Sequence, residues 1–224
     1  MRRILRDNSL SIVFLLLFLG ALGGQSVAGH SDYNEQAVAH GDPKISFGRY
    51  VVSSDFGVDV MENWQSEYLQ FTLMILATVW LLQRGSPESK ELDQSGRESD
   101  EKQMVGAYAQ QSSPRWAKAA GLKRKVYENS LVIVMGTIWL GTWSAQSVTG
   151  LVEYNSGRLD HHMATVGWWT YLGKADFWDK TLQNWQSEFL AVGSMAILSV
   201  YLRMRGSPES KPVGAPHTST GIEG

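Results

Sequence analysis

The chain has 224 residues, and its 20 Lys and Arg against 22 Asp and Glu leave a net charge of −2. This balance gives no expectation of a nucleic-acid partner, which normally requires a strongly basic surface. The absence of cysteine excludes disulfides, thiolate metal sites and cysteine nucleophiles. The mean hydropathy of −0.18 is typical of a soluble protein, but the apolar residues are gathered into four long runs.

Two short motifs occur twice, at a constant offset of 121 positions. Asn-Trp-Gln-Ser-Glu at 63–67 recurs at 184–188, and Arg-Gly-Ser-Pro-Glu-Ser-Lys at 84–90 recurs at 205–211. Residues 8–90 align with residues 129–211 without a gap, and 33 of the 83 aligned positions are identical. The chain is therefore a tandem duplication, and each copy contains two of the four apolar runs.

Each of the four apolar runs is long enough to cross a bilayer as a helix of about 20 residues. We predict an all-α membrane protein whose four transmembrane helices form two parallel tandem hairpins. The predicted organisation is a first repeat at 1–90 (spans about 10–28 and 64–82, outer loop 29–62), a flexible cytoplasmic linker at 91–122, a second repeat at 123–211 (spans about 131–149 and 185–202, outer loop 151–183) and a flexible tail at 212–224.

The first run has an alternative interpretation as a secretory signal peptide. Arg2, Arg3 and Arg6 form a basic start, and Ser26-Val27-Ala28 resembles a cleavage site. The duplication argues against this alternative, because the same segment recurs in the middle of the chain.

Loop charge predicts the orientation. The N-terminus, the linker and the tail hold 15 of the 20 Lys and Arg, whereas the two outer loops hold five of them and ten acids. Positive charge favours the cytoplasmic side, so both termini and the linker are expected inside the cell and both loops outside. The basic stretch 115–127 is expected to be an ordinary flank of the third span, with binding to anionic lipid headgroups as the alternative.

Local signals predict how the helices end and pack. Gly85 and Gly206, each followed by Pro, are expected to cap the second and fourth spans. The small residues Gly20, Gly23 and Gly24 are expected to allow close packing of the first span. Short helices are expected in the outer loops.

Glu67 and Glu188 are the candidate functional residues, because ionisable groups inside membranes often mark functional sites. A rise of 1.5 Å per residue places Gln25 and Glu67 at similar depth, and Gln146 and Glu188 repeat the arrangement. These four residues form a candidate intramembrane polar layer. The competing interpretation is structural, with each glutamate in the first turn of its helix and Asn63 or Asn184 as the cap.

No motif for catalysis or cofactor binding is present. His40 and His161 lie at equivalent positions of the outer loops, beside Asp42 and Asp160, but their spacing matches no metal motif. We therefore expect no catalytic residue, no cofactor and no metal, with these two histidines as weak metal candidates.

The repeated motifs resemble those of a family of bacterial integral membrane proteins known only as a domain of unknown function. The resemblance rests on residues 6–10, 24–26, 33–34, Phe56 with 62–69, and 84–90, most of which recur in the second copy. It implies four helices in the bacterial cytoplasmic membrane, and it implies no activity, substrate or catalytic residue.

The sequence thus favours a non-enzymatic membrane protein with a structural, sensing or partner-binding role in the cell envelope. One alternative is a small proton- or cation-linked channel or transporter that uses Glu67 and Glu188. A third class is a membrane enzyme that acts at the outer face through His40 and His161. The partners expected are the lipid bilayer and either a second copy or another membrane protein, and no nucleic acid.

Overall fold

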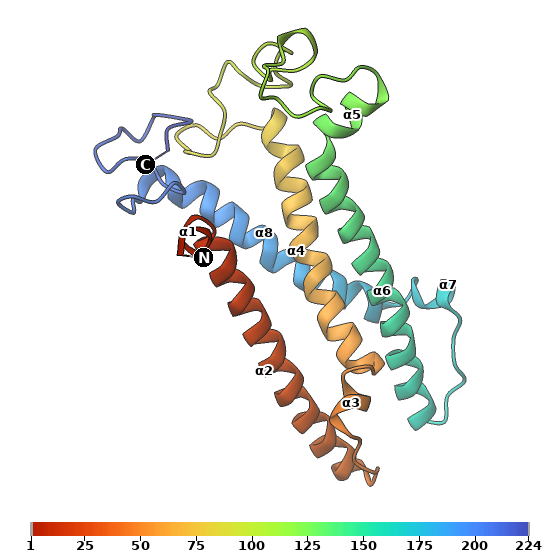
Figure 1. The fold of residues 1–224 in the computed structure, drawn as a ribbon. Helices are drawn as coiled ribbons and strands as arrows, with labels where there is room; N and C mark the ends of the chain where they lie inside the picture. The colour runs from red at the N-terminus through yellow and green to blue at the C-terminus, as the bar shows by residue number, and fades with distance from the viewer. Residues whose placement is uncertain (1, 224) are drawn as a thin grey trace. The chain divides into compact units, whose positions relative to one another are not determined.

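The computed structural model describes residues 2–223, and within them the regular structure is entirely helical (Figure 1). This agrees with the all-α fold class that the sequence predicts. The elements of the described residues are α1 (Arg2–Asp7), α2 (Ser9–His40), α3 (Phe47–Tyr50), α4 (Ser54–Trp80), the 3₁₀ helix η1 (Gly106–Tyr108), α5 (Leu122–Glu128), α6 (Ser130–Asp160), α7 (Trp168–Tyr171) and α8 (Ala175–Tyr201).

The duplication is visible in the helix boundaries. Helices α4 and α8 each have 27 residues, and both their first and their last residues are 121 positions apart. Helices α2 and α6 likewise begin at Ser9 and Ser130, and the short helices α3 and α7 begin at Phe47 and Trp168. The two copies therefore fold locally into the same series of elements.

The long helices continue well beyond the apolar runs. Helix α2 has 32 residues and reaches His40, so the first part of the segment expected as the outer loop 29–62 is helical. Gly41 caps the C-terminus of α2. Its φ of 84° is left-handed, and its N–H donates a hydrogen bond to a carbonyl of the last helical turn. Beyond it, α3 is one of the short helices expected in the outer loops, and α7 is the other.

Only two helices of the described residues, α2 and α6, are long and apolar enough to cross a membrane. The four predicted spans are thus not confirmed. The reason lies in the polar first halves of α4 and α8. After Glu67, α4 has thirteen residues left (68–80), which is about 20 Å of helix against about 30 Å of hydrocarbon.

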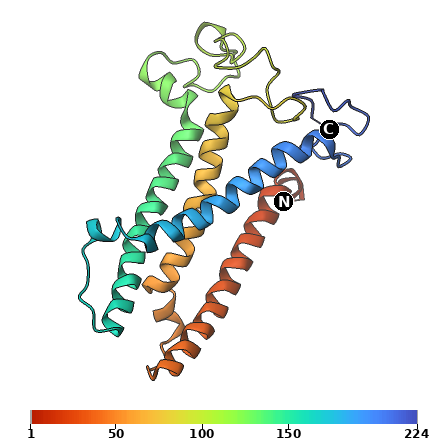
Figure 2. The same ribbon diagram turned by 180° about the vertical axis from the view of Figure 1, so that it is seen from behind.

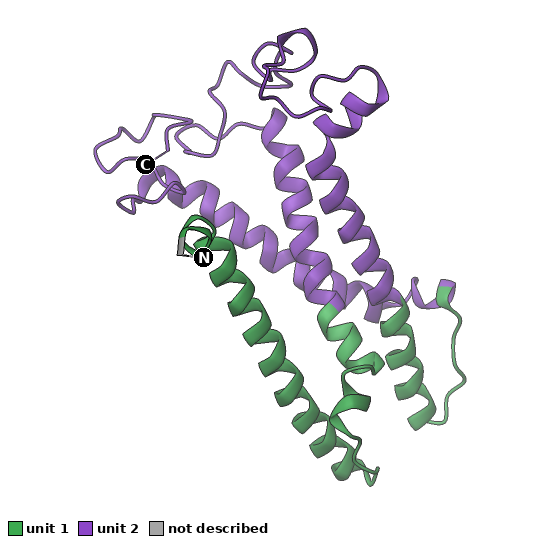
Figure 3. Ribbon diagram, in the orientation of Figure 1, with its two compact units in different colours: residues 1–60, 148–168 green, residues 61–147, 169–224 purple. Residues whose placement is uncertain are grey.

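The chain divides into two compact units (Figure 3). Residues 1–60 and 148–168 form unit 1, and residues 61–147 and 169–224 form unit 2. Because α4 and α6 are each divided between the units, these units do not coincide with the two sequence repeats.

The core of unit 1 is built around Tyr50. Its side chain is 3% exposed, and its ring lies 5.8 Å from Tyr33 and 5.4 Å from Phe56, centroid to centroid. The Tyr50 hydroxyl occupies the place that a Cβ atom on Gly29 would take. Glycine is therefore required at position 29, because any larger side chain would displace the ring.

Two asparagines fix the chain after α2 and after α6 in the same way. Asn34 accepts a hydrogen bond from the Ile45 N–H (2.8 Å) and donates one to the Ile45 carbonyl (3.1 Å). Asn155 holds Val166 identically, at 2.8 and 3.0 Å. The repeated Tyr-Asn pair of the sequence thus supplies a side-chain clamp on the backbone of each loop.

Residues 61–80 of α4 and 130–147 of α6 belong to unit 2, and these two helical segments run side by side, as the two views in Figures 1 and 2 show. Thr72 of α4 lies 3.7 Å from where a Cβ on Gly136 of α6 would stand, which brings the two backbones close. By contrast, Gly20, Gly23 and Gly24 have nothing within 4 Å of such a Cβ. The expected close packing at these three glycines is therefore not seen within unit 1.

Aromatic side chains form a cluster in unit 2. Trp143 of α6 is its centre, with its ring 5.8 Å from Trp139, 6.1 Å from Phe177 and 5.7 Å from Trp185. Aromatic pairs at such distances stabilise packing beyond the area that they bury. The cluster joins α6 to α8 within this unit.

Candidate functional site

Buried polar side chains from three helices meet beside the aromatic cluster of unit 2. Gln65 and Ser66 of α4, Gln146 of α6 and Thr181 of α8 are each at most 1% exposed. The Gln65 Oε1 atom accepts a hydrogen bond of 2.8 Å from the Trp185 indole. The Gln146 amide donates to the Thr181 hydroxyl at 3.5 Å. We call these four residues, together with the half-buried Trp185, the buried polar cluster.

The polar layer predicted from the sequence overlaps this cluster only in part. Gln146 belongs to the cluster, and Glu188 lies at its edge, where the Ser66 hydroxyl donates to a Glu188 carboxylate oxygen at 3.5 Å. Glu67 is exposed, although its charge acts on Glu188. Gln25 is exposed on α2 and belongs to unit 1.

The structural interpretation of the two glutamates, as first-turn acids, is wrong. Helices α4 and α8 begin at Ser54 and Ala175, so Glu67 and Glu188 each lie 13 residues inside a helix. The first turns contain Asp55 and Asp176 instead. The polar residues of the Asn-Trp-Gln-Ser-Glu motif extend the helices rather than starting them, because helices tolerate Gln, Glu and Ser well.

The repeated Arg-Gly-Ser-Pro-Glu-Ser-Lys motif folds into the same turn twice. The hydroxyl of Ser89 accepts from the Gln83 N–H at 2.9 Å, and the hydroxyl of Ser210 accepts from the Met204 N–H at 3.0 Å. We call residues 83–90 and 204–211 the exit turns. The same serine of each copy thus makes the same bond to the backbone.

The glycines of the exit turns do not cap the helices, contrary to the sequence prediction. Helices α4 and α8 end at Trp80 and Tyr201, five residues before Gly85 and Gly206. These glycines have φ angles of 85° and 80°, a left-handed conformation that favours glycine, within the exit turns themselves.

Arg203 satisfies the carbonyl groups at the end of α8. Its guanidinium donates to the carbonyls of Ser199, Val200 and Leu202 at 2.8–3.3 Å. A cation at this end of a helix also opposes the negative end of the helix dipole. Arg203 therefore caps the C-terminal end of α8.

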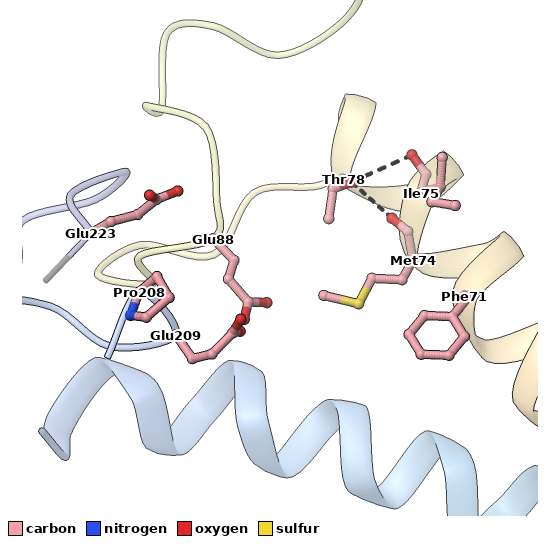
Figure 4. Close-up of a pocket in the computed structure, with 8 residues that line it drawn as sticks. All are labelled: Phe71, Met74, Ile75, Thr78, Glu88, Pro208, Glu209 and Glu223. Atoms are coloured by element: carbon pink, nitrogen blue, oxygen red, sulfur yellow. Dashed lines mark hydrogen bonds between the residues drawn. The ribbon is translucent and has the colours of Figure 1, made fainter. Parts of the chain in front are cut away.

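The two exit turns bring equivalent glutamates together. Figure 4 shows the carboxyl groups of Glu88 and Glu209 turned toward one another beside Pro208, with Phe71 and Met74 of α4 across the cavity. The cavity has a volume of about 350 Å³, and Glu223 also lines it. Glu88 is half-buried and Glu209 is exposed.

This arrangement changes the acidity of Glu88. Burial, together with a hydrogen bond and charge repulsion from Glu209, raises the pKa of the Glu88 carboxyl from 4.5 to about 7. Two carboxyl groups in contact cannot both ionise easily, so Glu88 keeps its proton to a higher pH than a solvated glutamate. Glu88 can therefore gain or lose a proton near neutral pH.

The lysine that ends each exit turn is held by carbonyl groups. Lys211 is fully buried and donates to the carbonyls of Pro216, His217 and Ser219 at 3.2, 2.8 and 3.1 Å. Burial, and to a lesser extent the charge of Arg203, lowers the pKa of the Lys211 ammonium. Lys90 makes a corresponding bond of 2.9 Å to the Gly96 carbonyl.

The histidines named as weak metal candidates are both exposed. His40 is the last residue of α2, and a ring nitrogen lies 2.8 Å from the Gln36 carbonyl, while His161 directly follows α6. Within residues 2–223, no group of three or more His, Cys, Asp or Glu side chains is arranged to hold a metal ion.

The sequence prediction missed Glu88 and Glu209 as a site and did not place Gln65 or Trp185 in one. A signal for the first pair was present, because both glutamates belong to a motif that is repeated letter for letter. Equivalent residues of a duplicated chain often meet around an approximate two-fold axis. The second pair gave no signal, because the contact joins different positions of the motif.

The sequence matches the family described as domain of unknown function DUF6766 over residues 1–222. No curated protein and no solved structure matches the chain.

Proposed function

The chain belongs to the DUF6766 family of unknown function, and we propose that it is a non-enzymatic membrane protein that responds to protons. The response resides in the Glu88–Glu209 carboxyl pair. The observation that carries this proposal is the convergence of the two equivalent glutamates on one half-buried cavity.

The exposed apolar surface of α2 supports the membrane location. Within its most apolar stretch, the side chains from Phe14 to Leu19 are 41–64% exposed, and none of that stretch is buried. Apolar side chains exposed around the whole circumference of a helix are typical of a lipid environment. We propose four spans in the bacterial cytoplasmic membrane, of which those of α4 and α8 include Glu67 and Glu188, because the helix after each glutamate is too short to cross alone. Both termini, the linker and therefore both exit turns lie in the cytoplasm.

Protonation would control how the exit turns associate. When the pair holds a proton, the protonated carboxyl donates a hydrogen bond to the other carboxylate. When the pH rises above the Glu88 pKa of about 7, two adjacent negative charges repel, and Glu223 adds a third acid to the same cavity. The exit turns would then separate, which transmits cytoplasmic pH to the ends of α4 and α8.

Spin-label distances test this response directly. The chain contains no cysteine, so the exposed, equivalent positions of Gln83→Cys and Met204→Cys can be labelled uniquely. In liposomes, we expect a narrow distance distribution at pH 5.5 and a longer, broader one at pH 8.5. Glu88→Gln should keep the short distance at both pH values, because its amide cannot ionise.

The control variant is Asp93→Asn, which removes an exposed acid from the same segment. It should respond to pH as the parent does. A distance that does not change with pH, or an equal pH response in Glu88→Gln, would contradict the proposal.

The alternative function is proton- or cation-linked transport through Glu67 and Glu188. One observation favours it: the Gln65 Nε2 donor of the buried polar cluster has no hydrogen-bond partner within the described residues. A buried donor of this kind is normally satisfied by water or a ligand. Proton flux in liposomes that disappears in the Glu67→Gln, Glu188→Gln double variant would establish transport and displace the sensing proposal.

A further inference from the structure

The segment that leads into α6 carries a run of positive charge. Residues 115–127 contain five Lys and Arg and no acid. Helix α5 ends at Glu128 and α6 begins at Ser130. The basic segment therefore directly precedes a helix that is long and apolar enough to cross a membrane.

The acids that contact this segment neutralise one of its five cations. Arg124 pairs with Asp100 at 3.2 Å and with Glu128 at 3.1 Å. The other four cations are exposed and, within residues 2–223, form no ion pair: Arg115, Lys118, Lys123 and Lys125. With both contacting acids counted, the segment keeps an excess of positive charge.

Helix α5 separates the neutralised cation from the others. A repeat of 3.6 residues per turn places Arg124 and Glu128 on one face, which the bond to Asp100 turns toward the linker. The opposite face carries Leu122, which is 77% exposed, between Lys123 and Lys125. The outer face of α5 is therefore both cationic and apolar.

A ring contact brings Trp116 to the same helix. Its ring lies 6.4 Å from the Tyr127 ring, centroid to centroid, and its side chain is 48% exposed. The predicted third span begins at about residue 131, so the hydrocarbon core does not account for the exposure of Trp116 and Leu122. We call Trp116, Leu122 and the four exposed cations the basic patch.

The composition of the basic patch is typical of a surface that binds anionic lipid headgroups. Lysine and arginine are attracted to the negative surface of the cytoplasmic leaflet, and exposed Trp and Leu beside them enter the boundary between headgroups and acyl chains. The seven residues of α5 span about 10 Å, which is about the distance over which this attraction acts.

From this arrangement we infer that the basic patch binds the anionic headgroups of the surrounding membrane, with Trp116 and Leu122 inserted between them. An ordinary flank of a span requires only positive charge on the cytoplasmic side, whereas this segment also presents exposed apolar side chains. The inference rests on the proposed membrane location and is independent of the Glu88–Glu209 response.

A spin label at Leu122→Cys tests the inference in the reconstituted full chain. The sequence contains no cysteine, so the label is unique. In phosphatidylcholine bilayers that contain phosphatidylglycerol, we expect dissolved oxygen to reach the label and an aqueous nickel chelate to be excluded. In phosphatidylcholine alone, or at high salt, the chelate should reach the label, because the attraction is removed or screened.

The charge variant combines Lys123→Gln and Lys125→Gln with the same label. Each cation at an anionic surface changes an equilibrium constant about fivefold, so the ratio of shielded to accessible label should fall about 20-fold. The matched control, Lys123→Arg with Lys125→Arg, keeps the charge and should keep the shielding. Lys102→Gln, which removes an exposed cation of the linker outside the basic patch, should also have no effect.

Three results would overturn the inference. Equal shielding with and without phosphatidylglycerol would show an ordinary flank that apolar contacts hold. Access of the chelate in both lipids would place the basic patch away from the membrane. Equal shielding in the parent and in the Lys123→Gln, Lys125→Gln variant would show that these cations do not bind headgroups.

The membrane proposal fails separately. A chain that is recovered from cells without detergent contradicts the membrane location, whereas a chain that needs detergent but leaves the label accessible contradicts the basic patch alone.

Discussion

Identical residues of the two repeats differ most in burial and partners where their side chains face other helices. They differ least where their side chains form hydrogen bonds with the backbone of a nearby loop. Asn34 and Asn155 clamp their loops with the same bonds. Gln65, in contrast, is fully buried, while its counterpart Gln186 is exposed. Identity of sequence between the copies thus preserves local turns, and the surroundings of each copy decide which side chains become part of a core.

The exit turns provide the sharpest way to test this difference. A Cβ at Gly85 would contact the His217 carbonyl and lie 2.9 Å from Val200 Cγ1, whereas a Cβ at Gly206 has nothing within 4 Å. Both positions have positive φ, which costs an L-residue about 1–2 kcal/mol. We expect Gly85→Ala to lower the free energy of unfolding by about 3 kcal/mol and Gly206→Ala by about 1 kcal/mol.

Equilibrium unfolding in mixed micelles measures both glycine variants under one condition. Equal losses would mean that the surroundings of the two exit turns do not differ as described.

The two asparagine clamps, in contrast, should lose similar amounts of unfolding free energy when each asparagine is replaced. Replacing Asn34 or Asn155 with Ala removes two hydrogen bonds to a part-buried loop backbone. Asn34 also lies 2.8 Å from a ring nitrogen of His30, a contact that Asn155 lacks because Leu151 stands at the equivalent position. Each variant should lose about 2 kcal/mol of unfolding free energy, as measured by the same unfolding experiment. A difference of more than about 1 kcal/mol between the two variants would show that the clamps are not equivalent.

The glutamines of the repeated motif should differ in the size of their effect. Gln65→Ala leaves the Trp185 indole N–H without its 2.8 Å partner and opens a space in a fully buried place, so we expect a loss of about 2 kcal/mol. Gln186→Ala alters an exposed side chain, with an expected effect within about 0.5 kcal/mol. Similar effects at the two positions would contradict the buried polar cluster.

The smallest expected effect is the pH dependence that Glu88 causes. Below its ordinary pKa of 4.5, this carboxyl is protonated in the folded and the unfolded chain. As the pH rises toward the folded pKa of about 7, the unfolded chain ionises first, so the folded state loses stability, and the loss is complete above that pKa.

The variant Glu88→Gln removes this loss. It should be more stable than the parent by roughly 1 kcal/mol at pH 8, after allowance for solvent screening, and equal to it at pH 4. Thermal unfolding at the two pH values, with Asp93→Asn as the control, provides the measurement. A stability gain that persists at pH 4 would have to come from packing rather than from charge.

Much of the fold follows from periodicity and repetition, because both act locally. The apolar runs and the constant offset predict the long helices, and short helices were expected in the outer loops, where α3 and α7 lie. The helix ends were misplaced, because Asn63 and Glu67 are residues that a helix can either start with or contain. Only the backbone from Ser54 onward decides between these two cases.

The candidate site could be predicted only in part, because it depends on contacts over a long distance in sequence. Gln146 and Glu188 were found from their polarity within apolar runs. The bond between Gln65 and Trp185 spans 120 positions, and the spacing of residues carries no information about it. The Glu88–Glu209 pair could have been inferred from the duplication alone, had the repeated acid been considered together with its copy.

The most direct test of the account is an infrared pH titration of the protonated carboxyl band in the reconstituted protein. The Glu88–Glu209 pair predicts a band that disappears with a midpoint near pH 7 and that is absent from the Glu88→Gln, Glu209→Gln double variant. A parent protein whose carboxyl bands all disappear near the ordinary glutamate pKa of about 4.3 would contradict the raised pKa of Glu88 and the proposed response to pH.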